Sequence, residues 1–275
     1  MHLTMLGVRG STSAPGADFV RYGGHTSCIG VSRQGGEAPT LVLDAGTGLR
    51  NLSAHWSFRP FQGSILLSHL HWDHVQGIPF FVSGDQEDAN VELFLPAQQG
   101  LTGEQLLAQS MAPPAFPITP SGLLGDWSFR TVEPGVLSIE GFTVTAAEIR
   151  HKGGRTFGYR VSDGVNEVAY LPDHRAAGAV TDGVEALVRD VDLLIHDAQF
   201  LEPERALADA YGHSTVDDAI GLASQLNVQR LMLFHHGPGR TDAQLDAIGE
   251  GLDAPLPVDV AREGSVVEVG GEGRG

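Results

Sequence analysis

Cysteine is almost absent from this sequence, because Cys28 is the single one among 275 residues. One thiol excludes an intramolecular disulfide, and it also excludes a zinc site built from several cysteine ligands. We expect Cys28 to be a small buried side chain and not a nucleophile. Any metal site in this chain must therefore use other side chains.

Basic side chains are also scarce. The chain has 17 Lys and Arg against 34 Asp and Glu, which gives a formal net charge of −17. This charge opposes the binding of a long polyanion such as tRNA or duplex DNA through general electrostatics. A small phosphate ester stays compatible with it, because metal ions can neutralise the ester locally. We therefore expect a small substrate and no long nucleic acid.

Long apolar runs are missing as well. No segment approaches the ~20 apolar residues needed to cross a membrane, and residues 1–6 show neither a basic start nor an apolar signal segment. We expect a cytoplasmic protein without a membrane partner. This length fits one large domain, which we predict over residues 1–269, followed by a glycine-rich disordered tail over 270–275.

The sequence does contain short apolar segments with helical patterns between them, and this alternation predicts an α/β fold. Helices are expected over 214–226, capped by Ser214, and over 241–252, where Thr241 begins a capping box. The Pro- and Gly-rich stretch 96–122 is expected to be irregular around one helical turn. The expected strands are 41–43, 65–67, 91–95, 142–149, 156–161, 168–171, 193–195 and 231–234.

Six consecutive residues are dense in histidine and aspartate, and they read His69-Leu70-His71-Trp72-Asp73-His74. Side chains two positions apart in an extended strand point to the same side, so His69 and His71 can bind one ion together. Asp73 and His74 follow after a turn and can reach a second ion. Imidazole and carboxylate groups suit Zn²⁺. A polar surface turn is the alternative, but a buried apolar run leads directly into the cluster, which favours a metal site.

Three further polar side chains stand where an α/β protein places its functional loops. These are His151, Asp173 and His235, each within two residues of the end of an expected strand. Singly, each fits a polar residue at the place where a strand meets solvent. Together with the cluster at 69–74, they supply the ligands that a centre of two ions still lacks.

These residues resemble the ligands of the metallo-β-lactamase-fold hydrolases, a family with four layers in the order αββα, and the resemblance covers nearly the whole chain. It implies one ion held by His69, His71 and His151, a second held by Asp73, His74 and His235, and a bridging Asp173. Zn²⁺ is the expected metal for both sites, with Mn²⁺ or Fe²⁺ as alternatives. The turn 43–46, Leu-Asp-Ala-Gly, resembles the Asp-x-Gly turn of the family, so Asp44 is expected to support the site from behind.

Other motifs resemble the phosphodiesterases of this family. Residues 195–198, Ile-His-Asp-Ala, resemble the His-Glu-Ala-Thr motif of the tRNA 3′-processing endonucleases (RNase Z), with aspartate in place of glutamate. Residues 212–215, Gly-His-Ser-Thr, resemble their His-Ser-Thr motif. Residues 6–12 and 22–28 resemble the related enzymes that act on phosphoribosyl 1,2-cyclic phosphate. His25 stands where asparagine is usual in those enzymes, and its role is open.

The predicted function is a dinuclear metal-dependent hydrolase that cleaves a small cyclic or nucleotide-like phosphodiester with a metal-bridging hydroxide. His213 is expected to protonate or stabilise the departing alkoxide, and Asp197 to orient its ring. Asp73 is the third residue assigned to catalysis. The N-terminus of the following helix should lower the pKa of His213, whereas Asp197 should raise it. A simple helix-capping neighbour is the alternative role for His213.

Four other functions stay open. A tRNA 3′-endonuclease is opposed by the charge of −17 and by the lack of an obvious basic arm. A lactone or thioester hydrolase would use the same ions but does not need Asp197 and His213. A redox di-iron protein would carry a carboxylate at position 71, and a silent sensor would not need the full ligand set. We also expect a homodimer.

The sequence does not select the side chains that bind phosphate. His174 has two open roles, contact with the substrate or a place on the surface, and His196 is expected to pack or form a hydrogen bond beside its strand. His235 is preferred over His236 as a ligand. Five basic residues lie near expected ligands and can bind a phosphate or remain solvated: Arg150, Lys152, Arg155, Arg175 and Arg240.

Overall fold

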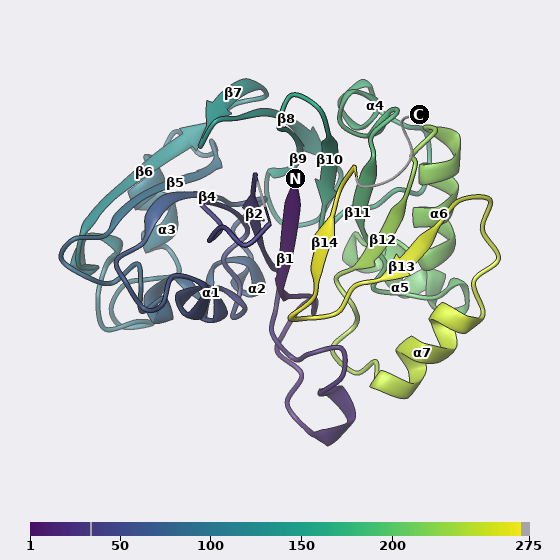
Figure 1. Ribbon diagram of the computed structural model, residues 1–275, viewed down its shortest axis with the longest axis horizontal. Coiled ribbons are helices and arrows are strands. Elements are labelled where there is room, and N and C mark those ends of the chain that lie inside the picture. Colours follow the sequence, from purple (N-terminus) through teal and green to yellow (C-terminus); the bar gives the residue numbers. More distant parts are fainter. Residues whose placement is uncertain (34, 271–275) are drawn as a thin grey trace.

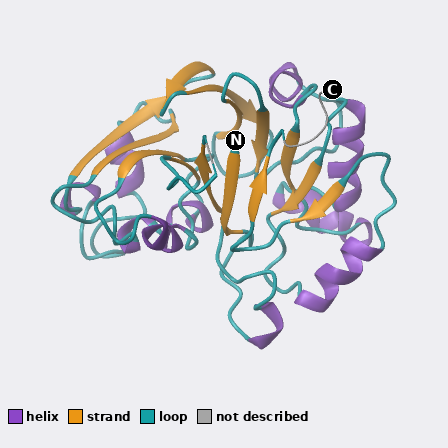
Figure 2. Cartoon of the chain, viewed as in Figure 1, coloured by secondary structure: helices purple, strands orange, loops and turns teal. Residues whose placement is uncertain are grey.

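Two seven-stranded sheets form the centre of the computed structural model, which describes residues 1–33 and 35–270. The sheets lie beside each other, and helices lie on their outer sides (Figures 1 and 2). The two sheets share one pattern of strand pairing. From one edge to the other, three antiparallel pairs of neighbouring strands are followed by three parallel pairs. One buried apolar cluster contains side chains of both sheets, including Leu3, Val31, Tyr159 and Ile195. The sheets therefore pack face to face.

Neighbouring strands in each sheet are also consecutive in the chain, except that the last strand of the chain returns to the edge of the first sheet. The first sheet contains β14 (Val266–Glu268), β1 (His2–Gly7), β2 (Cys28–Ser32), β3 (Leu41–Leu43), β4 (Gln62–Leu66), β5 (Asn90–Pro96) and β6 (Asp126–Val132). The second contains β13 (Val258–Val260), β12 (Leu231–Phe234), β11 (Leu193–Asp197), β10 (Glu167–Leu171), β9 (Thr156–Ser162), β8 (Phe142–Ile149) and β7 (Gly135–Ile139).

Helices cover the outer face of each sheet and bury an apolar layer against it. The first sheet carries α1 (Leu49–His55), α2 (Trp72–Val75) and α3 (Gly103–Ala108). The second carries α4 (Asp182–Val188), α6 (Val216–Gln225) and α7 (Asp242–Glu250), and α5 (Arg205–Tyr211) precedes α6 in the chain. Short 3₁₀ helices are η1 (Ala17–Phe19), η2 (Ile78–Phe80), η3 (Pro120–Gly122) and η4 (Glu202–Glu204). This arrangement is the predicted αββα sandwich of an α/β protein.

All eight expected strands are present, but the cap of one predicted helix is wrong. Thr215, not Ser214, caps α6, because its hydroxyl accepts a hydrogen bond from the Asp218 N–H at 3.2 Å. The Ser214 hydroxyl instead donates to the carbonyl of His174 at 2.5 Å. The predicted capping box at Thr241 is confirmed at the start of α7.

The remaining expectations concern irregular segments. The stretch 96–122 is largely irregular, as predicted, but after Pro96, the last residue of β5, it contains two short helices, α3 and η3, where one helical turn was expected. The predicted disordered tail 270–275 lies, apart from Gly270, outside the described residues. Within the described part of the chain, no helix has both the length and the apolar character that a membrane crossing requires.

Candidate metal centre

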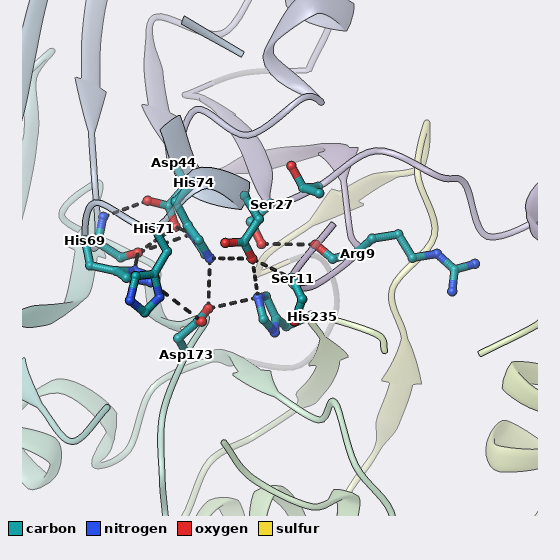
Figure 3. Close-up of polar contacts among 12 residues, drawn as sticks. Arg9, Ser11, Ser27, Asp44, His69, His71, His74, Asp173 and His235 are labelled. Atoms are coloured by element: carbon teal, nitrogen blue, oxygen red, sulfur yellow. Dashed lines mark hydrogen bonds and ion pairs between the residues drawn. The ribbon is translucent and has the colours of Figure 1, made fainter. Parts of the chain in front are cut away.

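The predicted ligands meet at one edge of the two sheets. The segment 69–74 follows β4 of the first sheet and enters α2, whereas His151, Asp173 and His235 follow β8, β10 and β12 of the second sheet. Figure 3 shows Asp173 between the imidazoles of the first segment and His235. The fold therefore joins donor groups that are more than 160 residues apart, since His235 Nε2 lies 3.2 Å from Asp73 Oδ2.

A first donor group contains three imidazoles and one carboxylate, from His69, His71, His151 and Asp173. The Nε2 of His151 lies 3.2 Å from the Nδ1 of His71. The Oδ2 of Asp173 lies 3.4 Å from His151 Nε2 and 3.7 Å from His69 Nε2. Ligand atoms about 2.1 Å from a zinc ion stand roughly 3.4 Å apart at the corners of a tetrahedron. These spacings therefore suit one ion.

A second donor group contains two imidazoles and two carboxylates, from Asp73, His74, His235 and Asp173, all buried. The Oδ2 of Asp73 lies 3.3 Å from His74 Nε2 and 3.2 Å from His235 Nε2. The Oδ1 of Asp173 lies 3.0 Å from each of the same two nitrogens. Asp173 thus directs one oxygen to each group, which is the geometry of a bridging carboxylate.

Several of these atoms are buried without a hydrogen-bond partner among the described residues. They are His69 Nε2, His74 Nε2 and Asp173 Oδ1. A buried polar atom without a partner costs about 1–3 kcal/mol, so such atoms require an explanation. Divalent ions with nitrogen and oxygen ligands would satisfy all three at once. The donor chemistry therefore fits two ions of the zinc type.

Hydrogen bonds on the far side of the imidazoles hold the rings in place. The Nδ1 of His74 donates to Asp44 Oδ2 at 2.7 Å, and the Nδ1 of His151 donates to the carbonyl of Gly212 at 2.8 Å. Asp44 also accepts hydrogen bonds from the Ser68 hydroxyl and the Tyr170 hydroxyl, both at 2.8 Å. Such outer partners fix the tautomer so that the lone pair of Nε2 would be free to bind an ion. Asp44 therefore lies where the sequence predicted.

The pKa directions agree with a cluster that binds cations. Burial lowers the pKa of His69, His71 and His151, so these rings stay neutral and can act as ligands. Burial also opposes ionisation of Asp173, but the charges of His235 and His74 outweigh it and hold this pKa well below its ordinary value. The first donor group therefore presents neutral imidazoles beside an ionised Asp173, whereas, against burial, the charges of Asp173, Asp73 and Asp44 hold the pKa of His74 well above its ordinary value.

His213 and Asp197 form a buried pair beside both donor groups. The Nδ1 of His213 donates to Asp197 Oδ2 at 2.8 Å. Burial lowers the pKa of His213, but the charge and hydrogen bond of Asp197 outweigh it and raise this pKa to about 9. Asp197 therefore acts on this pKa in the direction expected from the sequence, and the opposing effect found here is burial. His213 also lines a pocket of about 720 Å³ together with His71, Asp73 and Asp173.

The N-terminal loop contributes residues to which the sequence assigns no role. The Ser11 N–H donates to Asp73 Oδ2 at 2.7 Å, with Ser11 in the left-handed region at φ 62°. The Gln199 amide donates to the Ser11 hydroxyl at 3.1 Å and links the two halves of the fold. A Cβ on Gly10 would lie 2.3 Å from His235 Nδ1, so this position requires glycine. In the sequence, the one signal in the segment 6–12 is its resemblance to the enzymes that act on phosphoribosyl 1,2-cyclic phosphate. That resemblance does not show which of its residues contact the centre.

Other histidines lie outside the donor groups. The Nδ1 of His25 lies 2.7 Å from Glu263 Oε1 in a separate groove. His236 donates from Nε2 to the carbonyl of Ala261 at 2.9 Å, so His235 is the member of the pair that faces the centre. The surface role left open for His174 is wrong, because it is buried with its Nδ1 2.9 Å from His196 Nε2, whereas contact with the substrate stays a prediction.

Most of the five basic residues near the site are already paired with carboxylates. Arg155 binds Glu133 and Glu148, Arg175 binds Asp209, and Arg240 binds Glu204. Lys152 lines the pocket, and its ammonium donates to the carbonyl of Ala210 at 2.9 Å. Lys152 is therefore the basic side chain that is best placed to meet a bound anion.

Comparisons with known proteins agree with this geometry. Residues 40–236 match the family model described as Beta-lactamase superfamily domain. The Ribonuclease Z of Limosilactobacillus fermentum is 28% identical over 244 residues, which cover 70% of this chain and 76% of that protein.

Two solved structures share the fold at low sequence identity. The metallo-beta-lactamase fold protein YhfI from Bacillus subtilis has a TM-score of 0.70 at 20% identity, covering 97% of this chain and 99% of its own. A diphosphatase from the PhnP family has a TM-score of 0.69 at 19% identity and covers 97% of both chains. The likeness extends over both sheets and their outer helices.

Proposed function

The chain belongs to the beta-lactamase superfamily and is a metal-dependent hydrolase, and we propose that it is a phosphodiesterase for a small cyclic or nucleotide-like phosphodiester. The pair of Asp197 and His213 carries this proposal. Hydrolysis of a diester requires a group that protonates or stabilises the departing alkoxide. His213 can supply that group, because it lies beside both donor groups and a hydrogen bond of 2.8 Å to the buried carboxylate of Asp197 orients its ring.

In this proposal the two donor groups hold two divalent ions. His69, His71 and His151 would hold one, Asp73, His74 and His235 the other, and Asp173 both. When bound, such ions supply Lewis-acid charge for the phosphoryl oxygens and a water of lowered pKa. Zn²⁺ is the proposed metal because histidine predominates, and the carboxylates also admit Mn²⁺ or Fe²⁺.

The chain's own residues would divide the remaining work. Asp197 accepts from the Nδ1 of His213, which leaves Nε2 for the leaving oxygen. Asp197 also accepts hydrogen bonds from the N–H groups of His174 and Gln199, at 3.1 and 3.0 Å, so its carboxylate is held from three sides. The charge and hydrogen bond of Asp197 outweigh burial and raise the pKa of His213, which favours a proton on this ring.

A tRNA 3′-endonuclease is the second candidate, because the sequence relative described above is named Ribonuclease Z. The net charge of −17 opposes it, since a long polyanion would meet repulsion from the rest of the surface. A lactone or thioester hydrolase has no use for the pair of Asp197 and His213. The small phosphodiester is therefore the better proposal.

The test is hydrolysis of bis(p-nitrophenyl) phosphate, a cyclic nucleotide, a tRNA precursor and a lactone by the chain loaded with Zn²⁺ or Mn²⁺. We expect diester turnover that needs the metal, and a decrease of about 10²–10⁴-fold in His213→Ala at unchanged metal content. Cleavage of the tRNA precursor with little small-diester turnover would favour the endonuclease. Lactone turnover without diester turnover would refute both.

A further inference from the structure

Exposed aromatic side chains surround the mouth of the pocket above the candidate centre. Trp72 is 74% exposed and Tyr211 is 56% exposed, and both line the same pocket as His71 and His213. Phe200, which is half-buried, lines it as well and lies with its ring 5.9 Å from that of His213. Single exposed aromatics are common on proteins, whereas several at the mouth of one pocket indicate a binding surface.

We propose that Trp72 and Tyr211 form an aromatic rim that stacks on a nucleobase, so that the substrate is a diester containing a nucleoside. This inference rests on the proposed function and narrows it. Every base has a flat π face, and stacking on an aromatic side chain binds bases with little regard to sequence. A phosphodiester of sugar alone would leave the rim without a partner.

Trp72 is placed at the mouth by the residues on either side of it. His71 and Asp73 both point into the donor groups, and Trp72 is the first residue of α2. Its side chain turns outward while its carbonyl accepts the N–H of Gln76 at 2.8 Å. The ring is therefore held next to the centre by the backbone that presents the ligands.

Tyr211 reaches the mouth from the other half of the fold. It is the last residue of α5, and Gly212 ends that helix in the left-handed conformation at φ +81°. The Gly212 carbonyl accepts the Nδ1 of His151, and the next residue is His213. One short segment thus sets the position of the rim, of a donor imidazole and of the proposed acid.

A cation completes the rim. The ammonium of Lys152 lies 5.6 Å from the centre of the Tyr211 ring and lines the same pocket. A lysine over one face of an aromatic ring, in the pocket that contains the donor groups, can meet a phosphate while the ring meets a base. A nucleotide carries both groups, a base that the aromatic ring can contact and a phosphate that the lysine can bind.

Binding of AMP and of ribose 5-phosphate to the zinc-loaded protein, measured by calorimetry, tests this inference. The two ligands share the sugar phosphate and differ in the base. We expect AMP to bind more tightly, and Trp72→Leu and Tyr211→Leu each to weaken AMP binding roughly 5- to 150-fold. Ribose 5-phosphate should bind these variants as it binds the unaltered protein, and Trp72→Phe should retain most of the AMP affinity.

Phe80→Leu is the matched control, because Phe80 is 59% exposed but lines the separate groove that contains His25. It should leave both affinities unchanged. Equal affinity for the two ligands, or unchanged AMP binding in both rim variants, would overturn the inference. Because calorimetry measures binding without turnover, its result tests the aromatic rim separately from the phosphodiesterase activity, which the hydrolysis assay tests. Tighter binding of a single-stranded oligonucleotide than of AMP would contradict the small substrate.

Discussion

Asp173 is the residue on which the candidate centre depends, because its two oxygens face different donor groups. Its Oδ2 lies toward His69 and His151, and its Oδ1 lies 3.0 Å from both His74 and His235. A buried carboxylate surrounded by imidazoles is costly to maintain unless positive charge compensates it. The arrangement is therefore explained by bound cations better than by a purely structural role.

Removal of a single ligand should reduce metal binding while the chain still folds. His71→Ala removes one imidazole donor from the first group but leaves the second group complete. We expect the zinc content to fall toward one ion per chain, and diester hydrolysis to fall by more than the roughly 10–100-fold that loss of an outer partner costs. Atomic absorption and turnover measure both effects. His55→Ala, an exposed histidine at the end of α1, is the control, and equal metal content in the two variants would contradict the assignment.

Residues of the centre can be predicted from the sequence where a short segment already shows the right donor groups. The motif at 69–74 and the residues after three strands carry the right donor types, and the family match over 40–236 confirms the resemblance that links them. The roles of the individual ligands stay predictions. The balance between burial and Asp197 at His213 could not be predicted, because it depends on three-dimensional distances. The surface role considered for His174 is wrong, and nothing in its local sequence shows that it faces His196.

N-terminal caps contribute to the stability of the helices, and the cap of α7 allows this contribution to be measured. The Thr241 hydroxyl accepts the N–H of Gln244, and the Gln244 side chain accepts the N–H of Thr241. Thr241→Ala removes one of these bonds, so the free energy of unfolding should decrease by about 1 kcal/mol. Urea denaturation measures this change. Thr241→Ser keeps the hydroxyl and should stay near the parent value, and an equal loss in both variants would show that the hydroxyl is not what stabilises the helix.

Strands are easier to predict than short helices, for a physical reason. Strands such as β3 and β12 are buried and apolar, and their sequence signal is continuous. The helix α2 has only four residues and no side-chain cap, and two of its residues point into the centre instead of forming an apolar stripe. The cap predicted for α6 is wrong because Ser214 and Thr215 are adjacent and both can cap.

The whole molecule brings two similar halves together around the candidate centre. The first sheet supplies the segment 69–74, and the second supplies the three ligands that follow its strands. The order of strands within each sheet could not be predicted from the strand sequences alone, because pairing between distant segments is set by the packed core. The single domain over 1–269, the cytoplasmic location and the homodimer stay predictions.

Because the donors come from both halves, metal ions should stabilise the whole fold. An ion that binds only the folded chain, present at about 1,000 times its dissociation constant, contributes roughly 4 kcal/mol. In a chain of this size each kcal/mol shifts the thermal midpoint by about 2–4 °C, so chelation should lower it by roughly 10 °C. Differential scanning calorimetry before and after treatment with EDTA measures this shift.

Restoring the metal identifies what causes the change. Zn²⁺ or Mn²⁺ should return the midpoint, whereas Mg²⁺, which prefers oxygen ligands, should not, because five of the seven donor residues are histidines. His71→Ala should show a smaller decrease on chelation than the parent chain. An unchanged midpoint after complete metal removal would mean that the two halves are held together by the apolar core alone, and that the donor groups contribute nothing to the stability of the fold.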